Sequence, residues 1–157
     1  MNVQTQKIVG LLKKGSPEHQ MAAAIVLGEL RLRDREAVKA LGQALASAPK
    51  PVRLACVEAM GKIALPAGLP FLLPLLEIED GDTRGRALEA LSSFGPKAVP
   101  FISKRLMDAP PAVRRALVTV LARIGDRRST EALLSLIQAG HPEASREAAH
   151  ALSERSA

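Results

Sequence analysis

The apolar and polar positions of this chain recur with a long period, because one nine-residue pattern is written five times. Its clearest copy runs from Arg114 to Ala122, and the other copies begin at Gln20, Arg53, Arg84 and Ser145. The steps between their starting points are 33, 31, 30 and 31 residues. A nearly fixed period of this length predicts an array of similar helical units that stack on their neighbours.

Each unit contains two sets of apolar columns with helical spacing. Apolar residues three and four positions apart lie on one face of a helix, so each set predicts an inward face. The first set consists of Leu27, Met60, Leu91, Leu121 and Leu152, then Ala23, Cys56, Ala87, Leu117 and Ala148, then Leu30, Ile63, Phe94 and Ile124. The second consists of Ile8, Leu41, Leu72, Ile102 and Leu133, then Leu12, Leu45, Leu76, Leu106 and Ile137. Each repeat is therefore expected to hold an A helix followed by a B helix.

Turn residues set the expected helix boundaries. Gly125 is suited to a left-handed turn that ends one helix, and Asp126 is suited to capping the next. The A and B pairs are predicted at 17–30 with 34–47, 51–64 with 67–78, 82–94 with 96–108, and 112–124 with 129–139. A B-like helix is predicted at 3–14 and an A-like helix at 142–154. Pro74 lies inside its predicted B helix, where we expect a kink or a late start.

These elements predict one all-α domain, a solenoid of about ten helices over residues 1–157. It divides into a half-repeat at 1–15, repeats at 16–48, 49–79, 80–109 and 110–139, and a terminal half-repeat at 140–157. Repeat arrays need polar ends. We expect Arg155 to serve as a polar cap at one end, and a group of polar side chains to do so on one side of the other. That group consists of Gln4, Gln6, Lys7, Lys13 and Lys14.

The repeated pattern, R-x-x-A-x-x-A-L-G followed by a turn and A-x-P-x-L-x-x-x-L, resembles the HEAT repeat. The short period and the sequence Ile124-Gly125-Asp126 are similar to the variety named after the phycobilin lyases. The resemblance covers essentially the whole chain. It implies a right-handed α-α superhelix with convex A helices and concave B helices, and it implies protein-binding scaffolds far more often than enzymes. The pattern's arginine is replaced by Gln20 and Ser145, and its glycine by Ser92, Ala122 and Ser153.

Composition narrows the class of protein further. Apolar residues make up 47% of the chain but aromatic residues only 2%, so the core must be built from aliphatic side chains. A single cysteine excludes an internal disulfide framework and fits a reducing compartment. The N-terminal segment lacks the apolar core of a secretory signal, and no stretch reaches the length of a membrane span. We therefore expect a cytoplasmic protein that is monomeric or associates end to end through its terminal half-repeats.

Few residues suggest chemistry of their own. The arginine ladder at Arg53, Arg84 and Arg114 either contacts phosphate or carboxylate groups or, as we favour, bridges to acids or carbonyls in neighbouring turns. The acids considered for this role are Asp34, Asp82 and Asp126. Cys56 occupies a column of small apolar residues, which favours a buried side chain over a nucleophile.

No metal or cofactor site is expected. The histidines His19, His141 and His150 are scattered, lack metal-site spacing and are interpreted as surface residues. The acids between Glu77 and Asp82 lack the spacing of a calcium loop and are interpreted as a solvated turn. No catalytic residues are predicted, and a phycobilin lyase-like or chaperone role is an alternative that comes from the resemblance alone.

The net charge of +6 makes nucleic acid a second alternative. Aromatic stacking is a main source of single-strand affinity. The chain has no Trp or Tyr, and Phe71, Phe94 and Phe101 are all assigned to the core, so only contacts to the phosphate backbone remain. The residues considered for such contacts are Lys7, Lys39, Lys104, Arg127 and Arg128.

Our main functional hypothesis is a non-enzymatic scaffold that binds a protein partner on the concave surface of its B helices. Outward positions there differ from repeat to repeat while the core columns stay constant. One column holds Gly10, Gln43, Pro74, Lys104 and Ser135, and its neighbour holds Val9, Gly42, Leu73, Ser103 and Leu134. Leu73 and Leu134 are either surplus to the core or half-buried between B helices. The predicted partner surface consists of Lys7, Lys39, Gln43, Leu73, Pro74, Ser103, Lys104, Leu134 and Ser135.

Overall fold

A computed structural model of the chain describes residues 3–140 and 142–155, apart from the side chain of Arg155, so the cap predicted there lies outside the described side chains. Every regular element in the described part is helical, and this confirms the all-α prediction. The chain divides into two compact units, residues 1–93 and 94–157, and each unit is described by itself. Among the described residues, no helix is both long and apolar enough to cross a membrane.

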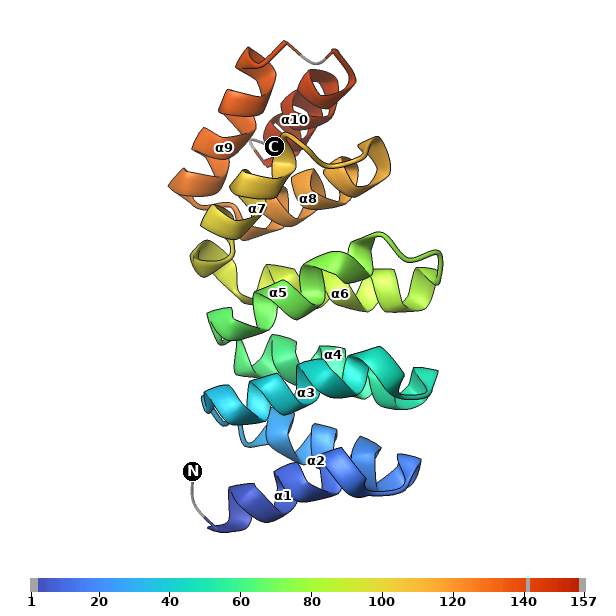
Figure 1. Ribbon diagram of the computed structural model, residues 1–157. Coiled ribbons are helices and arrows are strands. Elements are labelled where there is room, and N and C mark those ends of the chain that lie inside the picture. Colours follow the sequence, from blue (N-terminus) through green and yellow to red (C-terminus); the bar gives the residue numbers. More distant parts are fainter. Residues whose placement is uncertain (1–2, 141, 156–157) are drawn as a thin grey trace. The chain divides into compact units, whose positions relative to one another are not determined.

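Unit 1 is built from two layers of helices (Figure 1). The A layer contains α2 (Pro17–Glu29), α4 (Lys50–Ile63) and α6 (Gly81–Ser93), and the B layer contains α1 (Val3–Lys14), α3 (Arg35–Ser47) and α5 (Leu69–Leu72). Consecutive A helices lie against one another, and α1 lies against α3. These bounds agree with the predicted helices to within one residue at each end, except in the segment that contains α5.

Small residues hold the A helices of unit 1 close together. A Cβ atom placed on Gly28 of α2 would lie 2.8 Å from Cα of Ala59 in α4, and one placed on Gly61 would lie 3.0 Å from Cα of Ala90 in α6. Each contact therefore pairs a glycine of one repeat with an alanine of the next. This explains the glycine of the repeated pattern, because a larger side chain would push the two backbones apart.

The last predicted B helix of unit 1 is interrupted. A 3-10 turn at Pro66–Gly68 leads into the four-residue α5, and a second 3-10 segment, Leu73–Leu76, follows directly. Proline has no backbone N–H and its ring clashes with the preceding turn, so an α-helix cannot run through Pro74 undisturbed. The disturbance expected at this residue is confirmed.

Four A-helix ends share one backbone feature. Gly125 has a φ of 66° and Gly95 a φ of 58°, as the left-handed turn after an A helix requires. The corresponding residues of the first two repeats are not glycines, yet Arg31 and Ala64 take φ values of 46° and 47°. A side chain with a Cβ is strained in this region, so the turn is imposed by the repeat and not by the local residue.

Unit 2 contains a 3-10 turn at Gly95–Lys97, then α7 (Val99–Leu106), α8 (Pro111–Ile124), α9 (Arg127–Gln138) and α10 (Pro142–Arg155). Here α8 and α10 are the A helices and lie against each other, while α7 and α9 are the B helices and also lie against each other. Asp126 caps α9 as predicted, because its carboxylate accepts a hydrogen bond of 2.8 Å from the backbone N–H of Ser129.

The predicted core columns are largely confirmed. Leu27, Met60, Leu91 and Leu121 are all buried, as are Leu41, Leu72, Ile102 and Leu133. Leu30 is an error of the sequence analysis, since its side chain is exposed whereas Ile63, its counterpart one repeat later, is buried. Ile63 is covered because its helix, α4, packs against the preceding A helix, α2. Leu30 has no such cover, because α2 is the first A helix of the described residues.

Candidate partner-binding surface

The outward side of the B layer, here named the B ridge, contains most of the predicted partner residues. In unit 1, α3 buries one face of its helix through Ala37, Leu41 and Leu45, so its opposite face turns to solvent. Lys39 and Gln43 lie on that face, one turn apart, and both are exposed. Lys7 of α1 and Pro74 are exposed as well. The column that contains Gln43 is exposed at every position predicted to face outward.

Leu73 is an error in the predicted partner surface. Its side chain is only 8% exposed, so it belongs to the core and offers almost no surface to a partner. Of the two interpretations left open for Leu73, the structure favours burial.

The B ridge of unit 2 has its own described residues. Lys104 and Ser135 are exposed and Ser103 is half-buried. Leu134 is 46% exposed. Its counterparts Val9 and Gly42 are buried in unit 1, where α1 and α3 are each succeeded by another B helix further along the array, whereas α9 is the last B helix among the described residues. The exposure of Leu134 thus reflects its place at the last described B helix.

Phe101 contradicts the assignment of every phenylalanine to the core. Its ring lies on α7 and is 42% exposed. Lys104 follows it at i+3, so the two side chains share one face of the helix. The sequence argument against aromatic contacts with nucleic acid therefore does not apply to this residue.

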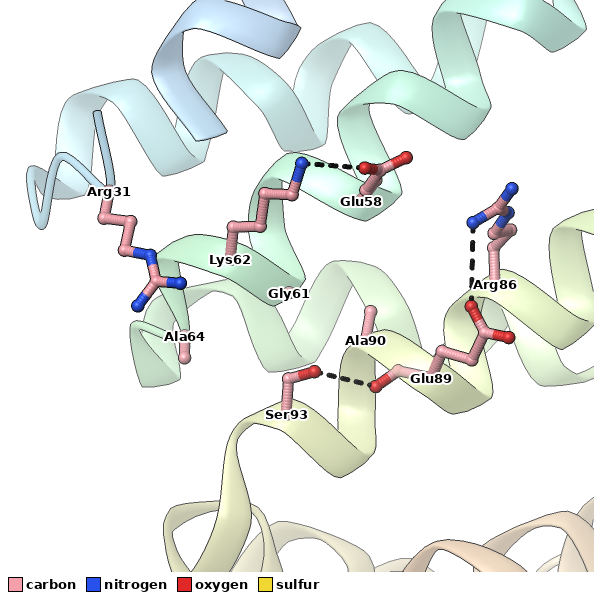
Figure 2. Close-up of a pocket in the computed structure, with 9 residues that line it drawn as sticks. All are labelled: Arg31, Glu58, Gly61, Lys62, Ala64, Arg86, Glu89, Ala90 and Ser93. Carbon is pink, nitrogen blue, oxygen red and sulfur yellow. Dashed lines mark hydrogen bonds and ion pairs between the residues drawn. The ribbon is translucent and has the colours of Figure 1, made fainter. Parts of the chain in front are cut away.

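The grooves on the A layer were not predicted from the sequence. Figure 2 shows the larger one in unit 1, with a volume of about 480 Å³, between the turn after α2 and helices α4 and α6. Most of its charged groups pair with one another: the ammonium of Lys62 lies 2.8 Å from Glu58 and 2.7 Å from Glu29, and Arg86 lies 3.7 Å from Glu89. Hydrogen bonds to Glu29 and Glu58 raise the pKa of Lys62. Arg31, which also lines the groove, takes part in none of the ion pairs of the described residues.

Two further grooves lie between adjacent A helices. One in unit 1, of about 310 Å³, is lined by apolar residues of α2 and α4 that include Met21, Ile25 and Leu54. One in unit 2, of about 430 Å³, lies between α8 and α10 and includes Arg115, Glu147 and His150. The glycine of the repeated pattern is the sequence signal that points to this layer, because Gly28 lies against Ala59 where α2 and α4 meet.

The arginine ladder position has a structural role in both units. In unit 2 the Arg114 guanidinium donates hydrogen bonds to the carbonyl oxygens of Leu106, Met107 and Ala109, with the shortest at 2.9 Å. Gln20 in unit 1 donates to the carbonyl of Leu12 at 3.0 Å, and Ser145 donates to that of Ile137 at 3.1 Å. Carbonyl contact is confirmed for Arg114. At Gln20, Arg114 and Ser145 the side chain therefore caps the end of the preceding B helix, because the last carbonyls of a helix lack partners within it. Arg53 differs, since its buried Nε has no hydrogen-bond partner.

The acids proposed as partners of the ladder have other contacts. Asp34 caps α3 by accepting from the backbone N–H of Glu36 at 2.8 Å. Asp82 lies 2.7 Å from the ammonium of Lys50, which also contacts Asp80 at 2.9 Å. Asp80 further accepts a hydrogen bond of 2.6 Å from the buried hydroxyl of Thr83. The acidic turn is therefore held by Lys50 and Thr83.

The remaining candidate residues fit their structural interpretations. Cys56 is fully buried, and burial raises the pKa of its thiol to about 12, far from a reactive thiolate. His19 and His150 are exposed, and His141 lies outside the described residues. In the described part of the chain, no three His, Cys, Asp or Glu side chains gather as a metal site requires.

Paired helices, a repeat near 31 residues and carbonyl-capping side chains at one repeat position define an α-helical repeat protein. The family model for HEAT repeats matches residues 5–92 and 99–157. The chain belongs to the HEAT-repeat family. No match was found among curated proteins.

Solved structures show the same fold. An engineered protein has 25% sequence identity and a TM-score of 0.56 over 99% of this chain and 80% of its own. The complex of CpcE and CpcF of phycocyanin lyase from Nostoc sp. PCC7120 has 21% identity and a TM-score of 0.61, over 97% of this chain and 65% of that one. A designed armadillo repeat protein in complex with peptide (KR)4 has 20% identity and a TM-score of 0.56, over 97% and 85%. At these identities the last two show the fold alone.

Proposed function

We propose that this HEAT-repeat chain is a non-enzymatic scaffold that binds an extended, acidic peptide segment of a protein partner on its B ridge. The observation that carries the proposal is the pair formed by Lys39 and Gln43. Both are exposed on one face of α3, and none of the ion pairs of the described residues includes Lys39. On the A layer of the same unit, Lys62 is bound by two carboxylates. Lys39 is therefore a positive charge on the B ridge that is available to a partner.

The side-chain chemistry suits an extended peptide. A glutamine amide both donates and accepts hydrogen bonds, so Gln43 matches the N–H and C=O groups of an extended main chain. A lysine ammonium has three donors and no acceptor, so Lys39 and Lys104 favour carboxylates. Pro74 adds a rigid apolar surface without a competing N–H.

The structural neighbours agree with a peptide ligand but suggest the opposite charge. The designed armadillo repeat protein is in complex with a basic peptide, (KR)4. The B ridge of this chain carries lysines at Lys7 and Lys39 in unit 1 and at Lys104 in unit 2. Electrostatic complementarity therefore selects an acidic partner.

The test uses the full chain and a fluorescent octapeptide of glutamate and alanine, with anisotropy as the readout. Reversing the charge in Lys39→Glu should weaken binding about tenfold, which corresponds to about 1.4 kcal/mol. Arg33→Glu makes the same charge change at an exposed position in the turn before α3 and should leave the affinity within about twofold. Equal losses of affinity in both variants would mean that only the net charge of the chain matters. That result would overturn the proposal that the B ridge is the binding site.

Phe101 favours a second candidate function, contact with single-stranded nucleic acid. Its exposed ring beside Lys104 combines a surface for stacking a base with a charge for phosphate. Anisotropy with a labelled oligothymidylate at increasing salt is the measurement. This function predicts an affinity that falls steeply with salt and is lowered further by Phe101→Ala, and it is excluded if no binding occurs at low salt.

A further inference from the structure

The groove between α4 and α6 contains a positive charge that its own side chains leave unpaired. Arg31, in the turn after α2, lines this groove of about 480 Å³, and its side chain takes part in no ion pair or hydrogen bond of the described residues. In Figure 2 its guanidinium points toward Ala64, whereas Lys62 and Arg86 are each joined to a carboxylate. Arg31 is therefore available to a ligand.

The backbone of Arg31 is strained. Its φ of 46° lies in the left-handed region, where the Cβ atom crowds the following carbonyl oxygen. Glycine avoids this clash and occupies the equivalent position of later repeats at Gly95 and Gly125. The turn itself does not require an arginine, so an arginine at this strained position points to a role for its side chain.

The other role open to this guanidinium is structural. Ala64 ends α4, and the carbonyl groups at the end of a helix attract positive charge. An arginine that serves a helix end in this protein is Arg114, which donates hydrogen bonds to three carbonyl oxygens. The side chain of Arg31 makes no such bond within the described part of the chain. Its geometry therefore favours a ligand over a helix cap.

The floor of the groove consists of small residues. Gly61, Ala64 and Ala90 line it, and a Cβ placed on Gly61 would lie 3.0 Å from Cα of Ala90. The hydroxyl of Ser93 at the rim donates a hydrogen bond of 3.0 Å to the carbonyl of Glu89, and its oxygen can still accept one. A peptide main chain can therefore approach the floor closely and donate an N–H group to Ser93.

Charge limits the ligand to one negative group at Arg31. Glu58 and Glu89 also line the groove, and a hydrogen bond from Lys62 lowers the pKa of Glu58, so this carboxylate stays ionised at neutral pH. Both acids repel a phosphate group, with its charge of about −1.5 to −2, more strongly than a carboxylate. The planar guanidinium can bind a carboxylate through two parallel hydrogen bonds.

We propose that Arg31 binds a carboxylate of a partner peptide in the groove between α4 and α6. The peptide main chain lies over Gly61 and Ala90 and donates an N–H group to Ser93. The carboxylate belongs to an acidic side chain or to the end of the partner's chain, and the experiment distinguishes these two sources. The site lies on the A layer, so it can fail or hold independently of the B ridge.

The probes are three short peptides, titrated into the isotope-labelled full chain and followed by two-dimensional NMR. Acetyl-Gly-Ala-Gly has a carboxylate at its chain end, acetyl-Gly-Asp-Gly-amide has one on a side chain, and acetyl-Gly-Ala-Gly-amide has none. At least one charged peptide should shift the backbone amide signals of Ala64, Ala90 and Ser93 to saturation, with a Kd of about 1 mM. The neutral peptide should not.

Matched variants locate the charge. Arg31→Gln and Arg33→Gln each remove one exposed arginine from the same turn. Arg31→Gln should abolish the saturable shifts, whereas Arg33→Gln should leave the Kd within about twofold. Arg31→Lys keeps the charge but loses the planar fork, so it should bind more weakly than the wild type. Arg31→Gly should abolish binding without lowering the Tm, because it also removes the backbone strain.

Three results would overturn the proposal: no saturable shift with either charged peptide, an equal loss in Arg33→Gln, or equal binding of the neutral peptide. A lower Tm for Arg31→Gly, together with no peptide binding by the wild type, would assign the side chain to the end of α4. Lys39→Glu on the B ridge should leave the shifts unchanged, because the two sites lie on different layers.

Discussion

The A and B layers of unit 1 follow the same repeat but are built differently. The A helices are unbroken over 13 or 14 residues and meet through glycine–alanine contacts between backbones. The B layer breaks at Pro74 and makes its own close contact through a side chain, because the ring of Phe71 lies against Gly42. Backbone contacts fix the separation of two helices, whereas a ring can shift. The A layer therefore sets the repeat spacing, and the B layer is free to vary its surface.

The largest expected change in the free energy of unfolding comes from truncating a core side chain of the B layer, in comparison with the exposed residue next to it. Leu73→Ala removes a buried side chain and should lower the free energy of unfolding by about 2–3 kcal/mol. Pro74→Ala, at the adjacent exposed residue, should change it by less than about 1 kcal/mol. Urea denaturation of both variants measures the difference. Similar small changes in both variants would contradict the assignment of Leu73 to the core.

The free energy of unfolding should be nearly as sensitive to the hydrogen bonds that join Arg114 of the A layer to the end of the preceding B helix. Arg114→Met keeps an apolar chain in place of the arginine stem but removes the hydrogen bonds to three carbonyl groups, and should cost about 1–3 kcal/mol. Arg115→Met next to it removes only an exposed pair with Glu147 at 3.7 Å and should cost a few tenths, about 0.5 kcal/mol at most. Thermal unfolding distinguishes them, and equal losses would show that Arg114 contributes as a surface charge only.

Glycine substitutions compare the A layer with an open helix surface. Gly28→Ala gains helix propensity but forces a Cβ to within 2.8 Å of the Ala59 backbone, for an expected net loss of about 1 kcal/mol. Gly10→Ala in α1 meets no atom within 4 Å and should gain about 0.5–1 kcal/mol. Opposite signs in chemical denaturation are the prediction, and a gain at both sites would mean that the A helices are not held at their closest approach.

A smaller gain is expected at the end of α4. Ala64 takes a left-handed conformation with φ of 47°, a position occupied by glycine in later repeats. Ala64→Gly relieves the steric cost but loosens the unfolded chain, so the net gain should be about 0.5 kcal/mol. Differential scanning calorimetry should show a slightly higher Tm. A lower Tm would indicate that the unfolded-state entropy outweighs the strain.

The smallest effect concerns the turn between the two layers. Hydrogen bonds from Thr83 and then Lys50 lower the pKa of Asp80 to about 2. A depressed pKa adds stability above the unfolded value, near 4, and that stability is lost as the pH falls towards 2. The difference in urea midpoint between the wild type and Asp80→Asn should therefore exist at pH 6, shrink below about pH 4 and vanish near pH 2. A difference that does not change with pH would contradict this.

The sequence predicted the fold well because its information is periodic. The columns that include Leu27 and Leu41 locate the core, and most helix ends follow from Asp and Pro residues that act locally. Leu30 was misread because its exposure depends on having a neighbouring repeat, which no local pattern reports. The charged groove around Lys62 was missed because its ion pairs join residues up to 33 positions apart. The B ridge of unit 1 was predicted correctly as exposed at Lys39, Gln43 and Pro74, and its ligand stays a proposal.

The glycine–alanine contacts make repeats of unit 1 interchangeable. If residues 29–61 were deleted, Gly28 would take the place of Gly61, and the surface that faced Ala59 would face Ala90 instead. Both contacts have the same chemistry, so the shortened array would keep its spacing. Duplication of the same segment would lengthen it by the same rule. The A layer can thus change length in whole repeats, but in the shortened array Val9 would take the place of Gly42 against the ring of Phe71, so the B layer would need a compensating substitution.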